Sequence, residues 1–295
     1  MASSTSEFEQ FLYTEAERYK GISYPVRSSF LRRRLVKKIS CAKIHPNPDD
    51  EFCMPEIGPN WGIISNYTKE IRQAVRNNEK HHIKEPILVE RIYPGGYMIL
   101  NGHHRWAAAI RAAEKRIPAR IVNLTRASDV KKMVRKNKNN KRATLDLDEI
   151  IFLRGEKDKA EKPLGFPLNR FFKEPMRLGV PALIHFLRKQ EYDIWVYSAR
   201  YFSVDYLQRY FRYYGARLDG IVTGLVDHRP GIEEIRTTMD QLVRTQYPQT
   251  IHIDSKSVLC IDRVNKKFRE YELSGRAETW AGEIMDSIRK YEKDL

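Results

Sequence analysis

Apolar positions in the first half of the chain predict a small α+β domain. Four short apolar runs are typical of strands, at residues 36–44, 86–89, 97–100 and 117–122. The second and third runs flank a Pro-Gly-Gly turn at 94–96, as in a hairpin. Helical spacing predicts one helix at 66–78 and another that begins after Asn101.

Strand-like runs and helical patterns alternate in the second half. The predicted strands are residues 193–197, 220–222 and 250–253. The predicted helices are residues 181–189, residues 204–214 and a segment that contains Ile232, Ile235, Met239 and Leu242. Alternation at these lengths predicts a mostly parallel sheet that helices cover on both faces.

Composition divides these elements into four segments. Residues 1–30 are predicted to be an N-terminal helical segment and residues 31–127 the α+β domain. Residues 128–142 contain a basic helix and a polar stretch that favours a linker. Residues 143–295 are the predicted parallel-sheet domain.

Positive charge is concentrated before residue 143. Residues 1–142 have 28 Lys and Arg against 14 Asp and Glu, a net charge of +14. The remainder has 25 against 24, a net charge of +1. Two basic runs, at residues 31–38 and 131–142, are typical both of solvated surface and of contact with nucleic acid. The sequence leaves that choice open.

The three cysteines, Cys41, Cys53 and Cys260, have no zinc-binding spacing. No apolar run approaches the roughly 18 residues that a membrane-spanning helix needs. The first 20 residues lack the apolar centre of a signal peptide. We therefore expect a cytoplasmic protein without a membrane partner.

Residues 101–105 have the composition of a phosphate-binding junction between a strand and a helix. Gly102 allows the backbone to approach an anion, and a helix N-terminus supplies free N–H groups. Arg105 can hold phosphate oxygens with two parallel hydrogen bonds, while His103 and His104 can donate to others. The simpler alternative is that the histidines cap the helix and Arg105 pairs with a surface acid.

The segment around this junction resembles the ParB/sulfiredoxin superfamily. The resemblance covers about ninety residues. The pattern that carries it runs from the strand at 86–89 to the strand at 117–122, with Gly-His-His-Arg between them. That motif is most similar to the Asp-Gly-His-His-Arg of the free-serine kinases, with Asn101 in place of the Asp. The resemblance implies a nucleotide-binding domain that takes ATP or ADP. It also implies a catalytic base in the loop after residue 44, for which Glu51 is our candidate. A purely structural polar turn at this loop is the alternative, and the sequence leaves that choice open.

Asp146 and Asp148 follow a short apolar run and point the same way in an extended chain. Two such carboxylates suit Mg²⁺. The segment 144–151 resembles motif I of the haloacid-dehalogenase (HAD) superfamily. The resemblance implies that Asp146 is a nucleophile and metal ligand, and that Asp148 is an acid/base and metal ligand.

Later segments resemble further HAD motifs in order. Ser198 closes the strand at 193–197, where motif II places a phosphate-binding hydroxyl. Asp254 follows the strand at 250–253, where motif IV places a metal ligand, and Asp262 is the rival for that place. Motif III lacks its lysine, and the candidate replacements are Arg229, Arg236 and Arg244.

These patterns together predict a small ParB/sulfiredoxin-like domain followed by a Rossmann-like, parallel-sheet HAD domain. The predicted function is phosphoryl transfer. A kinase-like domain would bind a nucleotide, and a Mg²⁺-dependent phosphohydrolase domain would act on a phosphorylated small molecule through an aspartyl-phosphate. The alternative is a DNA- or RNA-binding protein, or an enzyme that processes nucleic-acid ends, whose basic first module grips the phosphate backbone.

Overall fold

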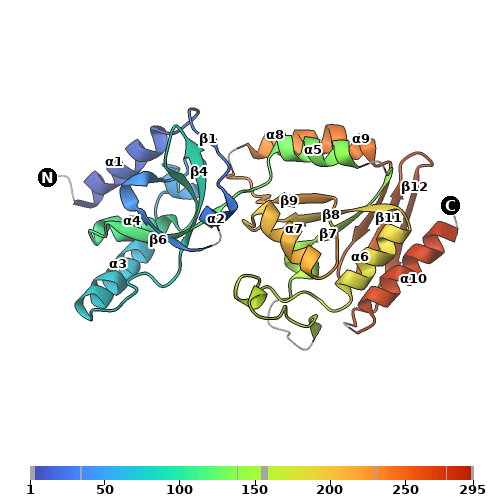
Figure 1. The fold of residues 1–295 in the computed structure, drawn as a ribbon. Coiled ribbons are helices and arrows are strands. Elements are labelled where there is room, and N and C mark those ends of the chain that lie inside the picture. Colours follow the sequence, from blue (N-terminus) through green and yellow to red (C-terminus); the bar gives the residue numbers. More distant parts are fainter. Residues whose placement is uncertain are drawn as a thin grey trace. The chain divides into compact units, whose positions relative to one another are not determined.

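A computed structural model describes residues 4–33, 35–137, 139–153, 159–229, 231–276 and 278–293. The chain divides into two compact units, and each has its own sheet and helices (Figure 1). Unit 1 comprises Met1–Asn123 and Asp227–Pro230. Unit 2 comprises Leu124–Val226 and Gly231–Leu295.

Unit 1 is a mixed sheet with helices. Its helices and short helical turns are α1 (Ser4–Glu17), α2 (Phe30–Arg33), η1 (Cys41–Lys43), η2 (Glu51–Cys53), α3 (Trp61–Arg76) and α4 (His103–Arg111). Its strands are β1 (Tyr24–Pro25), β2 (Lys37–Ser40), β3 (Ile44–His45), β4 (Ile87–Tyr93), β5 (Tyr97–Asn101) and β6 (Arg116–Val122).

The sheet of unit 1 has the order β2-β6-β4-β5-β3, and β1 pairs with β4. The antiparallel pairing of β4 with β5 confirms the predicted hairpin. Three consecutive alanines of α4, Ala107–Ala109, are fully buried among the apolar side chains of this unit. Their small side chains let α4 approach its neighbours closely, which fixes the position of its first turn.

Unit 2 contains a longer sheet. Its helices and helical turns are α5 (Ala127–Lys136), η3 (Leu147–Ile151), η5 (Leu168–Arg170), α6 (Val180–Lys189), α7 (Val204–Tyr213), α8 (Ile232–Thr238), η6 (Met239–Val243), α9 (Arg244–Gln246) and α10 (Trp280–Lys293). Its strands are β7 (Lys141–Asp146), β8 (Tyr192–Ser198), β9 (Gly220–Thr223), β10 (Gln249–Ile253), β11 (Ser257–Asp262) and β12 (Lys267–Glu272).

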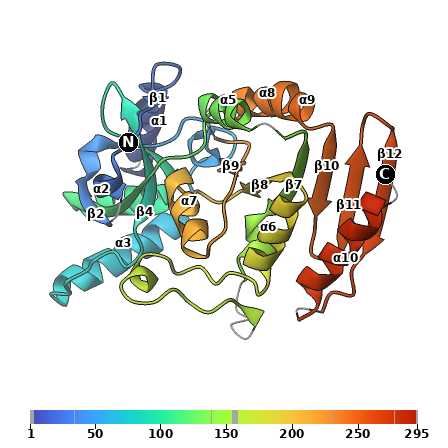
Figure 2. The same cartoon turned by 45° about the vertical axis from the view of Figure 1, so that its right-hand side comes forward.

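The sheet of unit 2 has the order β12-β11-β10-β7-β8-β9. The strands β10, β7, β8 and β9 are parallel, as the sequence predicts, whereas β11 and β12 add an antiparallel edge. Figure 2 shows α6 and α10 in front of this sheet. Both units together form a mixed α/β protein with two sheets.

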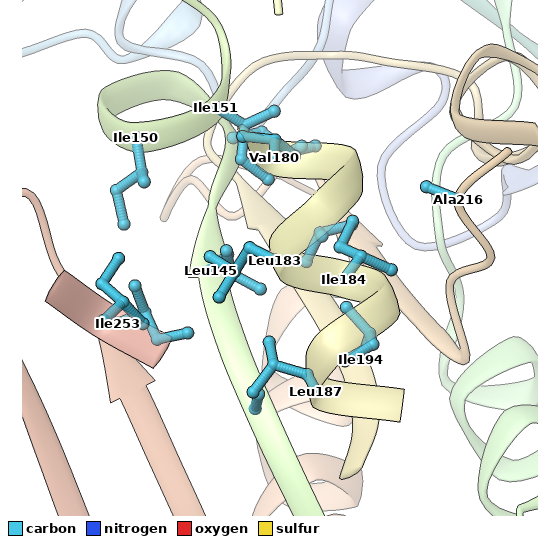
Figure 3. Packing of buried hydrophobic residues seen from close by; sticks show 14 of the residues in the cluster. Leu145, Ile150, Ile151, Val180, Leu183, Ile184, Leu187, Ile194, Ala216 and Ile253 are labelled. Atoms are coloured by element: carbon cyan, nitrogen blue, oxygen red, sulfur yellow. The ribbon is translucent and has the colours of Figure 1, made fainter. Parts of the chain in front are cut away.

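The main core of unit 2 lies between β7, β8, β10 and the helices α6, α7 and α10. Leu183 and Leu187 of α6 lie beside Leu145 of β7, with Ile253 of β10 close by (Figure 3). These side chains are at most 4% exposed. Burial of four such side chains anchors β7 and β10 just before their carboxyl ends.

The structure differs from the predicted segment at 128–142. This stretch is not a linker, because α5 packs on unit 2 and β7 already begins at Lys141. Ala127 and Val130 of α5 are buried with Trp195, Val222 and Ile235. The helix is basic on its exposed side only. Because its basic residues outnumber the apolar ones, the apolar pattern is weak in the sequence.

The new boundary also redistributes the charge. Unit 1 has 21 Lys and Arg against 14 Asp and Glu, a net charge of +7. Unit 2 has 32 against 24, a net charge of +8. The contrast of +14 and +1 between the two parts of the sequence is therefore not a contrast between the folded units.

No helix in the described part of the chain is long and apolar enough to cross a membrane.

Gly220 tests the packing of β9 on β8. An ideal Cβ on Gly220 would lie 1.9 Å from Cδ2 of Trp195, its partner in the pairing of these strands. We expect Gly220→Ala to lower the free energy of unfolding of unit 2 by about 1–3 kcal/mol, because Trp195 is fully buried and has no room to move.

Gly282→Ala in α10 is the matched control, since a Cβ there meets nothing within 4 Å. It should be neutral or stabilising by up to about 1 kcal/mol. Denaturant unfolding with tryptophan fluorescence measures both. Equal stabilities for the two variants would contradict the packing described here.

Candidate functional site

The junction between β5 and α4 is built around Gly102. Its φ of 102° lies in the left-handed region, and a Cβ would lie 2.6 Å from Cγ2 of Ile87. Only glycine satisfies both conditions. Among the described residues, no hydrogen bond is made by the backbone N–H groups of His103, His104 and Arg105. The first turn of α4 therefore presents three free donors.

His103 is buried, and its ring accepts a hydrogen bond. Nε2 accepts from the backbone N–H of Asn47 at 3.2 Å, and Nδ1 lies 3.5 Å from Oδ2 of Asp50. The ring also stacks on Phe52 with 5.3 Å between centroids. Burial lowers the pKa of His103 to about 4, although Asp50 opposes this. The imidazole is therefore neutral near pH 7.

His104 makes the equivalent bond at the other end of the same loop. Its Nε2 accepts from the backbone N–H of Asn60 at 3.0 Å. Asn60 is the N-cap of α3. Burial also lowers the pKa of His104. The two adjacent histidines thus hold both ends of the loop 47–60 at the start of α4. This role is structural, and it is closer to the predicted alternative, in which the histidines cap the helix, than to donation of hydrogen bonds to a phosphate.

Arg105 is held by carbonyl and carboxylate oxygens. Nη1 lies 3.2 Å from the carbonyl oxygen of Glu85, 3.1 Å from its Oε2, and 3.4 Å from the carbonyl oxygen of Pro86. Nη2 donates to Oδ1 of Asn101 at 3.0 Å. The Glu85 side chain is 80% exposed, so an anion can displace it with little loss of packing.

Two cavities lie in unit 1. One of about 370 Å³ opens beside Arg105, between α3 and residues 79–85. A larger one of about 1140 Å³ is lined by α1, residues 40–45 and the second half of α4. None of the predicted site residues lines the larger cavity. Only the smaller one adjoins the junction, and its volume is in the range of small-molecule sites.

The loop after β3 brings Asp50, rather than Glu51, to the junction. Glu51 is exposed in η2. Asp50 caps that turn by accepting from the N–H of Phe52 at 3.0 Å, and it faces His103. Sequence reasoning missed Asp50 and Asn47. The stretch Pro-Asn-Pro-Asp-Asp at 46–50 contains both residues, but in the sequence it indicates only a turn, because their contacts with His103 come from a distant part of the chain.

In unit 2, the predicted residues gather at the carboxyl edge of the parallel strands. Asp146 ends β7, Ser198 ends β8, and Asp254 directly follows β10. Asp262 lies at the opposite edge, since it pairs with Gln249 at the start of β10. It is fully buried and accepts from Asn265, so it is fixed in a turn.

Asp148 and Ser198 are in direct contact. Ser198 Oγ donates to the Asp148 carboxylate at 2.9 Å, and the N–H of Ala199 donates to it at the same distance. Arg200 completes the group, with Nε 2.7 Å from Oδ1 of Asp148. Asp146 uses Oδ1 to accept from the N–H groups of Asp148 and Glu149. Its Oδ2 makes no described hydrogen bond and remains available.

Arg200 is a cation that sequence reasoning missed, although it lies two residues after Ser198. Its guanidinium carbon lies 4.5 Å from the ring centroid of Phe202, and its buried Nη2 has no hydrogen-bond partner. The three arginines named for motif III lie elsewhere. Arg229 is in the segment 227–230 of unit 1, Arg236 pairs with Glu233, and Arg244 is in α9.

The carboxylates of this edge do not form a metal site as they are arranged. The Asp148 carboxylate accepts hydrogen bonds from Ser198 and Arg200, and the Asp254 carboxylate accepts one from Ser255. In the described residues, no three His, Cys, Asp or Glu side chains gather closely enough to hold a metal ion. Magnesium binding through Asp146, Asp148 and Asp254 stays a prediction of the sequence.

Comparison with known proteins supports one part of the resemblance. Residues 31–141 match the family described as the ParB N-terminal domain, so the first half of the chain contains a ParB-like domain. No curated protein matches the chain. The match extends beyond the predicted domain end at residue 127. It does not reach most of unit 2, where the HAD resemblance stays a prediction.

Among solved structures, the chain is similar to the C-terminally truncated chromosome-partitioning protein ParB from Caulobacter crescentus, which was crystallised with CTP-gamma-S. The two are 26% identical over 36% of this chain and 56% of that chain, with a TM-score of 0.25. The present chain thus spans just over half the length of that protein.

His103 should make the stability of unit 1 depend on pH. Its pKa of about 4 in the fold lies below the unfolded value of about 6.5, so the unfolded chain takes up the proton first. The contribution of the neutral ring is complete above about pH 6.5 and is lost as the pH falls toward 4. One such proton gives at most about 1.4 kcal/mol per pH unit.

His103→Gln keeps an acceptor but cannot titrate, so its unfolding free energy should fall less steeply between pH 6.5 and 4. The control is His81→Gln, an exposed position between α3 and β4. Denaturant titrations over this pH range measure both slopes. A slope for His103→Gln equal to that of the unmodified protein would show that the ring is not buried in its neutral form.

Proposed function

We propose that unit 1 binds the phosphate groups of a nucleotide at the amino end of α4. The observation that carries this proposal is the ParB-like sequence of residues 31–141, which includes the junction at Gly102. The donors are the three free N–H groups of the first turn and the guanidinium of Arg105. The positive end of the helix dipole adds a favourable field for an anion. The cavity beside Arg105 provides space for the rest of the ligand.

In this proposal the histidines position the loop rather than donate to the phosphate. Their ring nitrogens already accept from Asn47 and Asn60, and a neutral ring has one donor only. The guanidinium of Arg105 leaves Glu85 for the phosphate, because a dianion is the stronger partner. Binding of this kind needs no catalytic base, so a kinase activity is a separate matter.

Arg105→Ala should weaken nucleotide binding by about 1.5–3 kcal/mol, because a charged hydrogen-bonding group is lost. Arg105→Lys should lose less, since it keeps the charge but not the two-pronged geometry. Calorimetry with CTP, ATP and ADP is the measurement. Arg120→Ala, an exposed arginine on β6, is the control and should bind as the unmodified protein does.

Nucleic acid is the competing ligand of unit 1. A strand that contacts several phosphates binds with an affinity that falls steeply as salt rises, whereas a nucleotide shows a shallow fall. Titration of a single-stranded and a double-stranded oligonucleotide at two salt concentrations distinguishes them. Absence of nucleotide binding, together with steep salt dependence for an oligonucleotide, would replace the nucleotide by nucleic acid.

We propose, as a second function, that the carboxyl edge of unit 2 binds and hydrolyses a phosphate monoester. The observation that favours it is the group Asp146, Asp148, Ser198 and Arg200, gathered where parallel strands end. The parallel strands β10, β7, β8 and β9, with Asp146 at the end of β7 and Ser198 at the end of β8, also support it. The buried, unpartnered Nη2 of Arg200 is a donor suited to a phosphate oxygen.

Each residue has a distinct part in this second proposal. The free Oδ2 of Asp146 attacks phosphorus, and the bond from phosphorus to the ester oxygen breaks. Asp148, once Ser198 and Arg200 turn from it to the phosphate, takes a proton from solvent and passes it to the leaving oxygen. Water then cleaves the aspartyl-phosphate, which restores the Asp146 carboxylate. In this proposal Arg200 and Ser198 turn from Asp148 to the phosphoryl oxygens, and Arg200 supplies the cation that the sequence lacks as a motif III lysine.

Asp146→Asn should reduce hydrolysis of p-nitrophenyl phosphate at least roughly 100-fold, since the amide cannot form the covalent intermediate. Assays with and without Mg²⁺ also test the metal. Asp286→Asn, on the exposed side of α10, is the control and should keep full activity. Wild-type turnover by a folded Asp146→Asn variant would exclude Asp146 as the nucleophile.

A further inference from the structure

One face of the unit 2 sheet carries polar side chains in its two central strands. In the pairing of β7 with β10, Arg142 is opposite Thr250 and Thr144 is opposite His252, so all four point to the same side. Central strands of parallel sheets are usually apolar on both faces. The opposite face follows that rule, with Ala143, Leu145, Ile251 and Ile253 in the core. The polar face therefore needs an explanation.

Arg142 is buried without a counter-ion. It is 7% exposed, and its Nε donates to Oγ1 of Thr250 at 3.0 Å. Nη1 donates to the hydroxyl of Tyr197 at 3.3 Å, and the ring centroid of Tyr247 lies 5.8 Å from the guanidinium. No carboxylate in the described part of the chain lies within 4.0 Å of it. Hydroxyl groups satisfy some of its N–H donors but leave its charge uncompensated.

Further positive charge is close to Arg142. Arg263 follows β11, and its N–H donates to the carbonyl oxygen of Pro248, two residues before Thr250, which puts it on the same face as Arg142. Desolvation, then repulsion by Arg244 and Arg142, lowers the pKa of Arg263. Nη1 of Arg263 donates to the carbonyl oxygen of Arg244 at 3.0 Å. Acids are also near this group: Asp240 lies 3.8 Å from Nη1 of Arg244, and the buried Asp193, the partner of Arg142 in the pairing of β7 with β8, accepts from Asn139 and Tyr247. An anion would remove this repulsion.

His252 provides a further donor on the same face. Nδ1 lies 2.6 Å from Oγ1 of Thr144. The carbonyl oxygen of Ile251, at 3.4 Å, competes for the single proton of the Thr144 hydroxyl. The shorter contact favours donation to Nδ1, and the neutral ring then carries its own proton on Nε2 and can donate from there. Burial, then Arg142 and Arg263, lowers the pKa of His252 to about 4, so its ring is neutral near pH 7.

We propose that Arg142, Arg263 and His252 form a binding site for a phosphate group on this face of the sheet. The remaining N–H donors of Arg142 and Arg263 and the Nε2–H of His252 come from three strands or strand ends. A tetrahedral anion with several acceptor oxygens matches such convergent donors, and arginine binds phosphate with a two-pronged geometry.

The site goes beyond the proposed function. Its residues lie before the carboxyl ends of β7 and β10, and none of them belongs to the group of Asp146, Asp148, Ser198 and Arg200. It therefore binds a second phosphate, whichever chemistry the carboxyl edge performs. That phosphate belongs either to a small phosphorylated molecule or to a nucleic-acid strand.

Calorimetry with inorganic phosphate at constant ionic strength tests the site in the full chain. We expect Arg142→Gln and Arg263→Gln each to weaken phosphate binding about tenfold or more, since each removes a charged donor. Arg217→Gln is the matched control, because that arginine is 76% exposed and lies beside Asp219. Circular dichroism checks folding, and Arg263→Gln decides the result if Arg142→Gln does not fold.

The variants Arg105→Ala and Arg200→Gln show how much phosphate binds at the two sites of the proposed function rather than at this one. A loss confined to those two variants, or no phosphate binding by the unmodified protein at millimolar concentration, overturns this site. A loss in Arg142→Gln and Arg263→Gln with normal binding in the other two supports it, even if the proposed function fails.

Phenyl phosphate and a single-stranded oligonucleotide identify the source of the phosphate. Binding of phenyl phosphate with the affinity of inorganic phosphate indicates a small molecule. Tighter, steeply salt-dependent binding of the oligonucleotide that Arg142→Gln abolishes indicates nucleic acid. Failure of both probes to compete with inorganic phosphate would overturn the assignment to a phosphorylated ligand.

Discussion

The parallel pairing of β7 with both of its neighbours is the constraint on which unit 2 depends. It aligns the carboxyl ends of β7, β8 and β10, and this brings Asp146, Ser198 and Asp254 to one edge although they are far apart in sequence. The alternation of side chains along the same strand sends Leu145 into the core and Arg142 and Thr144 to the other face. One register thus sets the core, the polar edge and the polar face.

The junction of unit 1 depends on hydrogen bonds of a different kind. Two imidazoles are used as acceptors for backbone N–H groups, and such bonds require neutral rings. The resulting loop stays close to α4 without occupying the N–H groups of its first turn. A sequence motif that reads as a set of phosphate ligands is thus divided: His103 and His104 hold the loop, and Gly102 and Arg105 are left for the proposed anion.

Much of this fold could be predicted from the sequence, because apolar spacing reports local structure directly. The hairpin of β4 and β5, helix α4 and the parallel strands β8, β9 and β10 follow from such spacing, whereas the place of β7 came only from the motif resemblance of residues 144–151. Strand β12 could not be predicted, since its residues, Lys267–Glu272, are mostly exposed and polar. Helix α5 was placed in a linker because its basic residues outnumber the apolar ones that pack on unit 2.

The candidate sites were predictable in position but not in the partners of each group. Asp146, Asp148 and Ser198 could be named because they follow apolar strands. Arg200 and Asp50 could not be assigned, since their roles come from contacts across 52 and 53 residues of sequence. Partnership between distant residues is set by strand order, and a single sequence carries little information about it.

Charge must therefore be assessed by local arrangement rather than by its total. The two units have nearly equal net charges, +7 and +8, so neither is marked as the anion-binding unit by charge alone. What distinguishes the candidate sites is the environment of single guanidinium groups. Arg105 has an exposed partner that an anion can replace, Arg200 has an unpartnered donor, and Arg142 is buried with hydroxyl partners only. Since a buried charge is costly until an opposite charge compensates it, Arg142 has the most to gain from an anion.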